Sequence, residues 1–187
     1  MGRQMISSVA PLRLEHQRIL EVADAAEELA RKIETQQSVR PSTPVAINEL
    51  FFLYAHVIHR DKEELLLFPV LRNKGVREGS CIGVLLSEHK ENDAAYASME
   101  QAATEYATGD AAALLRWAEA AHVYCNRLRY HVRREELLFM NAEKLLSDAE
   151  HADLALQFQR LDEKARRAGL QDRIEAAQQQ MSGANKP

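Results

Sequence analysis

The chain contains few of the residues that interrupt helices or build disulfide frameworks. Its 187 residues include only seven glycines, five prolines and two cysteines. So few helix breakers argue against a turn-rich chain, and the plentiful alanine, leucine and glutamate favour helices. Cys81 and Cys125 lie far apart and form no C-x-x-C motif, which is typical of reduced, partly buried thiols in a cytoplasmic protein. We therefore expect an all-α fold.

The sequence also lacks an excess of positive charge and any long apolar run. Its net charge is -4 and its pI about 6.0, and lysine and arginine are scattered among the acidic residues. Nucleic-acid-binding domains usually carry a basic face. No run approaches the roughly 18 apolar residues that span a membrane, and the stretch "MGRQMISSVAPL" has no apolar core of a signal peptide. We expect a soluble, cytoplasmic protein that binds neither nucleic acid nor membranes.

Four long stretches carry apolar residues at alternating steps of three and four, the spacing of an amphipathic helix. Short polar loops between them predict an up-down-up-down four-helix bundle with a further C-terminal helix. We expect one domain over residues 8–170, followed by a helical extension over 171–187 that frays after about Gln178. The predicted bundle helices span about residues 11–33, 45–70, 85–106 and 114–145.

The two halves of the predicted bundle resemble each other in sequence. The segment "HRDKEELLLF" at residues 59–68 matches "HVRREELLFM" at 131–140, and "LEHQRIL" at 14–20 matches "SEHKEND" at 87–93. The first helix pair therefore repeats in the second. Such a repeat predicts a bundle with an approximate two-fold axis.

Six titratable residues occupy positions where the helical pattern requires core residues. An H-x-x-x-E spacing places both side chains on one helix face. Two carboxylates in one core repel each other, and leaving them ionised without partners is costly. A pair of divalent cations removes that cost, whereas the alternative, a metal-free structural bundle, leaves it in place. The candidate metal ligands are His16, His59, Glu63, His89, His131 and Glu135.

The donor set of imidazoles and carboxylates, without cysteine, favours iron over manganese or zinc. The segments "LEHQRIL", "HRDKEELLLFPVL", "SEHKENDAAY" and "LRYHVRREELLFMNA" resemble the hemerythrin family, specifically bacterial hemerythrin-like HHE domains, over roughly residues 10–165. This resemblance implies two iron ions with two bridging carboxylates in a four-helix bundle.

The chain departs from the family pattern at two positions. Arg60 stands where many relatives have a second, adjacent histidine, and Asp93 stands where oxygen-carrying members have a fifth one. His56, one turn before His59, is a candidate fifth ligand or an outer-shell partner of the metals. Tyr96 and Tyr124 are expected to pack near the site.

Four glutamates neighbour the candidate ligands in sequence. Glu15 and Glu88 each precede a site histidine, and we interpret them as exposed helix charges, with proton transfer near the site as the alternative. Glu64 and Glu136 follow the candidate bridging pair at about 100° around the helix, and we interpret them as surface or outer-shell groups.

An iron pair with few protein ligands has open positions, which implies a small ligand such as O2, NO or peroxide. We predict a function in oxidative or nitrosative stress defence. The alternatives are an iron donor for the repair of iron-sulfur centres and a ligand-responsive sensor without turnover. The sequence leaves open whether the protein is an enzyme and identifies no catalytic residue. We expect a monomer or weak dimer.

Overall fold

The computed structural model describes residues 7–77 and 81–182, which form helices joined by short turns and contain no strand. None of the described helices is long and apolar enough to cross a membrane. The helical segments are α1 (Ala10–Glu34), α2 (Ser42–Phe51), η1 (Phe52–Arg60), η2 (Glu63–Leu67), α3 (Phe68–Asn73), α4 (Cys81–Ala107), α5 (Ala113–Leu145), α6 (Asp148–Arg167) and α7 (Leu170–Ser182).

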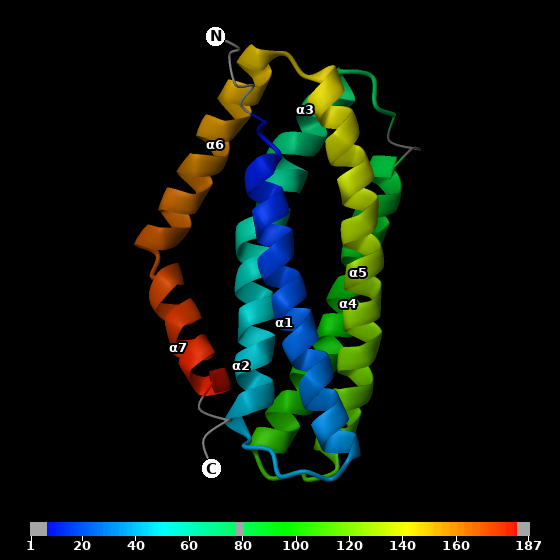
Figure 1. Cartoon of the computed structure of the whole chain (residues 1–187), viewed down its shortest axis with the longest axis vertical. Coiled ribbons are helices and arrows are strands. Elements are labelled where there is room, and N and C mark those ends of the chain that lie inside the picture. Colours follow the sequence, from blue (N-terminus) through cyan, green and yellow to red (C-terminus); the bar gives the residue numbers. More distant parts are fainter. Residues whose placement is uncertain (1–6, 78–80, 183–187) are drawn as a thin grey trace.

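Four long helical rods build the bundle, as the apolar pattern predicts (Figure 1). They are α1, the continuous rod from α2 to α3, α4 and α5; α5 packs against both α1 and α4, and α2 packs against α1 and α4. Pro11 lies in the first turn of α1, where its missing N–H costs no hydrogen bond. The all-α fold is therefore confirmed, with one helix pair from each half of the repeat.

The second rod is not a regular α-helix. Its segments η1 and η2 are π-helical, with hydrogen bonds from residue i to i+5. Pro69 follows in the first turn of α3, and the rod ends at Asn73. Gly75, at a φ of +88°, follows the last turn, so the rod ends at a glycine in the left-handed region rather than at Pro69. The sequence pattern did not predict the π segments.

Two apolar clusters fill the bundle, and a polar layer separates them. One cluster contains Trp117, Tyr124 and Phe51, and the other contains Phe68 and Phe139. The candidate ligands lie between the two clusters along each helix; His16, for example, falls between Leu12 of one cluster and Ile19 of the other. Apolar packing on both sides thus keeps the polar layer in the middle of the bundle.

Two helices, α6 and α7, follow the bundle and run back along its side beside the second rod; we name them the C-terminal arm (Figure 1). A capping box between Ser147 and Glu150 starts α6. Gly169, at a φ of +83°, separates α6 from α7. A glycine thus separates the two helices of the arm, and the domain boundary at residue 170 stays a prediction.

The arm contributes buried side chains to both apolar clusters. Phe158 of α6 packs in one cluster, and Ile174 and Ala177 of α7 pack in the other. The sequence predicted fraying after about Gln178, but α7 continues to Ser182, and Met181 packs against the core. This packing gives the last turn the tertiary support that an isolated helix end lacks. Residues 183–187, the rest of the predicted tail, lie outside the described part.

Candidate metal centre

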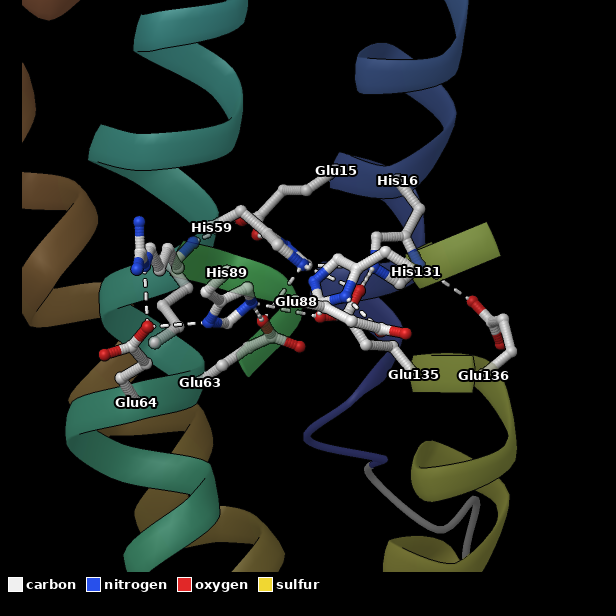
Figure 2. A network of polar contacts seen from close by, with 12 residues as sticks. Glu15, His16, His59, Glu63, Glu64, Glu88, His89, His131, Glu135 and Glu136 are labelled. Carbon is white, nitrogen blue, oxygen red and sulfur yellow. Dashed lines mark hydrogen bonds and ion pairs between the residues drawn. The ribbon is translucent and has the colours of Figure 1, made fainter. Parts of the chain in front are cut away.

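All six candidate ligands are buried and meet in the polar layer (Figure 2). Each rod of the bundle contributes at least one of them, because the ligands lie on the core-facing stripe of each helix. Helix α1 supplies His16, the second rod His59 and Glu63, α4 His89, and α5 His131 and Glu135.

The six residues form two overlapping groups. The ligand atoms of His16, His59, Glu63 and Glu135 lie within 4.8 Å of one another, and those of Glu63, His89, His131 and Glu135 do the same. Both glutamates belong to both groups. This arrangement matches two neighbouring cation positions with shared carboxylates, related by the sequence repeat.

The two H-x-x-x-E motifs differ in geometry. In the regular helix α5, His131 Nε2 lies 2.6 Å from Glu135 Oε1, whereas in the second rod His59 Nε2 lies 3.5 Å from Glu63 Oε2. Residues four apart no longer stack directly where the hydrogen bonds span five residues. The π segments therefore make the two halves of the site unequal.

The carboxylates retain unused binding capacity. Both oxygens of Glu63 are buried without a hydrogen-bond partner. Buried polar atoms in folded proteins almost always have partners, and an orphaned pair at a candidate site calls for a specific explanation. Four imidazoles and two carboxylates fit divalent first-row transition metals. The donor set therefore suits metal ions bridged by Glu63 and Glu135.

The charges in the cluster are strongly coupled. Burial and the neighbouring Glu135 raise the pKa of Glu63. Burial lowers the pKa of His89, but its contacts with Glu135 and Glu63 outweigh this effect and raise it to about 10. The pKa of His59 is likewise raised, since Glu63 and Glu135 outweigh burial. The raised pKa values of His59 and His89 thus favour protonated rings beside the two carboxylates.

Each site histidine contacts a carboxylate through its outer nitrogen, Nδ1 (Figure 2). Such partners fix the ring orientation of a metal-binding histidine and increase its basicity. The Nδ1 distances are 3.0 Å from His16 to Glu136, 3.1 Å from His59 to Glu15, 2.6 Å from His89 to Glu64 and 3.0 Å from His131 to Glu88.

These contacts correct the interpretation of Glu15 and Glu88 as exposed charges. Glu15 is buried, and Glu88 is half-buried; each orients the histidine of the next rod along the chain. Glu64 and Glu136 instead orient histidines of the opposite half. The sequence repeats the pairs Glu-His and Glu-Glu in both halves, and this repetition was the available sign of these contacts. Helical periodicity alone, however, does not say which neighbouring rod a side chain contacts.

A basic residue pairs with each of these four carboxylates in turn. The pairs are Lys62 with Glu15, Arg134 with Glu88, Arg60 with Glu64 and Arg13 with Glu136. Each imidazole therefore contacts a carboxylate, and that carboxylate in turn pairs with a lysine or an arginine. Such a network restricts the motion of the imidazoles before any metal binds.

A small cavity of about 30 Å³ opens onto the cluster itself: all the candidate ligands except Glu63 line it, together with His56, Arg60, Asp93 and Tyr124. Arg60 Nη1 lies 2.6 Å from Asp93 Oδ1, so the two residues that depart from the family pattern pair with each other. His56 belongs to neither group of candidate ligands. Its Nδ1 lies 3.4 Å from Asp93, and its Nε2 is buried without a hydrogen-bond partner.

The tyrosines lie where the sequence places them. Tyr124 lines the cavity, and the Tyr96 ring lies 5.1 Å from the His56 ring. Tyr96 also donates a hydrogen bond to the backbone oxygen of Asn48. Both side chains thus combine packing with a place beside the site.

Comparison with known proteins identifies the family of the chain. The hemerythrin HHE cation-binding domain matches residues 7–142, which include all six candidate ligands and exclude the C-terminal arm. The resemblance seen in the sequence extended to about residue 165, and the match is shorter. Searches of curated proteins and of solved structures gave no significant match. The matched region is well over half of the sequence, and the chain belongs to the hemerythrin HHE cation-binding domain family.

Proposed function

We propose that this metal-binding protein holds two iron ions and binds or reacts with O2, NO or peroxide in oxidative or nitrosative stress defence. The observation that carries the proposal is the pair of overlapping ligand groups that share Glu63 and Glu135. Iron, when bound, supplies redox chemistry and open coordination positions. The six residues named as ligands are part of this proposal.

The roles of the residues follow from the grouping. His16 and His59 would hold one ion, His89 and His131 would hold the other, and Glu63 and Glu135 belong to both groups and would serve both ions. The imidazoles donate through Nε2, because Nδ1 of each ring faces a carboxylate. That contact holds the Nδ1 proton in place and leaves the Nε2 lone pair for a metal.

The adjoining cavity supports a small ligand. Its volume of about 30 Å³ accommodates one or two water-sized molecules. Its lining includes the charged side chains of Arg60 and Asp93 and the largely apolar side chains of Tyr124, Leu128 and Val132. A diatomic molecule or peroxide fits this space.

The first test is metal content per chain after loading with ferrous iron. We expect about two irons in the natural protein and almost none in the double variant Glu63→Ala/Glu135→Ala. Glu28→Ala is the control, because Glu28 is an exposed helix residue that pairs with Lys32 on its own helix and belongs to neither ligand group. Full metal retention by the double variant would refute the assignment of the site.

The second test concerns the ligand. Anaerobic iron-loaded protein is mixed in turn with O2, NO and hydrogen peroxide, and the visible absorption is followed. We expect a rapid spectral change with at least one of them. No change with any of the three would rule out the proposed ligand class while leaving the metal site intact.

The iron-donor alternative is tested separately. The carboxylates behind all four imidazoles oppose easy release of metal, so this network favours ligand binding over donation. Iron transfer to a chromophoric chelator, timed with and without an added apo iron-sulfur protein, distinguishes the two. Rapid transfer only to the apo protein would support the donor function instead.

A further inference from the structure

Lys62 is a fully buried lysine one residue before the proposed bridging Glu63. Its side chain is 0% exposed, and it pairs with two carboxylates, those of Glu15 and Asp162. Removing an ammonium group from water is costly unless good partners replace the water. The fold therefore places these two acids around a cation that lies just outside the metal centre.

The contacts of Lys62 connect the C-terminal arm to a candidate ligand. Asp162 of α6, whose side chain is 49% exposed, lies 2.5 Å from Lys62 Nζ through Oδ1. Lys62 pairs with Glu15 Oε1, and the other oxygen of Glu15, Oε2, lies 3.1 Å from His59 Nδ1. A continuous chain of charged contacts thus runs from α6 through Lys62 and Glu15 to His59.

The other half of the repeat contains the same series of charged contacts, from a basic residue through a glutamate to a histidine, without a contribution from the arm. Arg134 occupies the position that corresponds to Lys62 in the matched segments. Its Nη1 lies 2.9 Å from Glu88 Oε1, and Glu88 Oε2 lies 3.0 Å from His131 Nδ1. The Arg134 side chain, however, is 53% exposed.

This difference in burial has a physical consequence. Exposed ion pairs are weakened by water, by dissolved salt and by the freedom of their side chains. A buried pair is screened much less and has one fixed geometry. Glu15 is therefore held more rigidly against His59 than Glu88 is against His131.

We propose that the arm, through Asp162, Lys62 and Glu15, makes the two metal positions unequal, so that the ion at His16 and His59 is held more tightly and the ion at His89 and His131 exchanges first. Lys62 is a positioning residue in this arrangement and does not touch the metal. The inference rests on the proposed pair of metals. Asp162 lies outside residues 7–142, which match the family domain.

The test compares matched variants of the full chain, Lys62→Met and Arg134→Met, using cobalt(II) as the probe. Two successive dissociation constants are measured by competition with a chelator, and the visible bands of cobalt report the coordination of each ion. We expect Lys62→Met to weaken the tighter position at least tenfold. Arg134→Met is expected to change either constant less than threefold.

Two further variants separate positioning from folding. Lys62→Arg keeps the positive charge and is expected to restore the tighter constant to within threefold. Asp162→Asn leaves the Lys62–Glu15 pair in place and is expected to weaken the same constant by about threefold, even if Lys62→Met fails to fold. If the dissociation constant of the tighter position is unchanged in Asp162→Asn, the arm does not influence that position and the proposal is wrong.

The outcomes distinguish this inference from the proposed function. If Lys62→Met and Arg134→Met weaken cobalt binding equally and both variants still bind two ions, the proposed inequality of the two positions is wrong, while the proposed pair of metals stands. Binding of fewer than two cobalt ions by the natural protein would contradict the proposed pair of metals and the inference together. In Lys62→Met we expect the visible bands of only one of the two cobalt ions to change.

Discussion

His16 Nε2 lies 3.0 Å from His59 Nε2, although the two rings come from different rods of the bundle. Two imidazole nitrogens at this distance share a proton when no cation lies between them. Glu135 Oε2 lies 3.0 Å from the same His16 nitrogen, so the carboxylate and the His59 ring both contact His16 Nε2. The cluster is thus arranged for a positive charge, whether proton or metal.

Metal affinity is therefore expected to rise with pH. The pKa of His59 is raised well above its usual value, and that of His89 to about 10, which favours the cationic form of both rings, with a proton on each nitrogen, at neutral pH. A metal must displace these protons. Lowering the pH strengthens the competing protons and weakens binding, and raising it towards 10 has the opposite effect.

Calorimetry of zinc binding in buffers with different ionisation enthalpies measures this release. We expect more than one proton to be released per chain near neutral pH, and a dissociation constant that falls steadily between pH 6 and pH 8. Binding without proton release would show that the imidazoles are already neutral in the metal-free protein.

The carboxylates behind the imidazoles give a second prediction. Glu88 Oε2 lies 3.0 Å from His131 Nδ1. Glu88→Ala removes this contact and frees the ring, and loss of such a partner typically costs about 10–100-fold in metal affinity. We expect at least a tenfold weaker cobalt constant at one of the two positions.

Glu91→Ala is the matched control for Glu88→Ala. It lies on the same helix, is exposed and pairs only with the exposed Arg127. Its metal affinity should equal that of the natural protein. A similar loss in both variants would indicate a general effect of negative charge on metal binding.

His56 provides a third prediction. Its burial lowers its pKa, so the ring is neutral at neutral pH, and its unpartnered Nε2 is available beside the cavity. We expect His56→Leu to retain its metal, because His56 belongs to neither ligand group. Loss of the acceptor should weaken binding of peroxide about tenfold, the cost of about one hydrogen bond.

Metal content and peroxide affinity are measured together on His56→Leu. His122→Leu serves as control, since His122 lies on α5 at the surface and pairs with Glu34. If His56→Leu loses one metal, His56 is a ligand rather than a cavity residue.

The sequence was sufficient to predict the bundle and the six residues that meet in it. Both follow from one rule, the position of a residue on the core-facing stripe of a helix, and His16 or Glu135 satisfies that rule without knowledge of any partner. The repeat then predicted that the two halves face each other. These are local patterns, which a single chain displays directly.

The remaining features depend on contacts between distant segments. Lys62 is buried and pairs with Asp162 of α6, and the segment "HRDKEE" gives no sign of that distant contact. The same holds for Glu15, which meets a histidine 44 positions away. The apolar spacing of the second rod is that of a regular helix, so the sequence pattern does not reveal the π segments.

A fourth prediction tests whether the arm is an integral part of the fold. Phe158 of α6 is 1% exposed and packs in the cluster that also contains Phe68 and Phe139. Its replacement by alanine leaves a cavity, and such changes cost about 3–5 kcal/mol of unfolding free energy. For a chain of this size each kcal/mol lowers the midpoint of thermal unfolding by about 2–4 °C.

We therefore expect the unfolding midpoint of metal-free Phe158→Ala to fall by roughly 10 °C in scanning calorimetry. Leu156→Ala is the matched control on the same helix, because Leu156 is 47% exposed and its loss should change stability by less than about 0.5 kcal/mol. If Phe158→Ala instead unfolds in two separate transitions, the arm melts independently of the bundle. The link from Asp162 to His59 could then be broken without unfolding the metal centre, and metal affinity would fall with the first transition rather than the second.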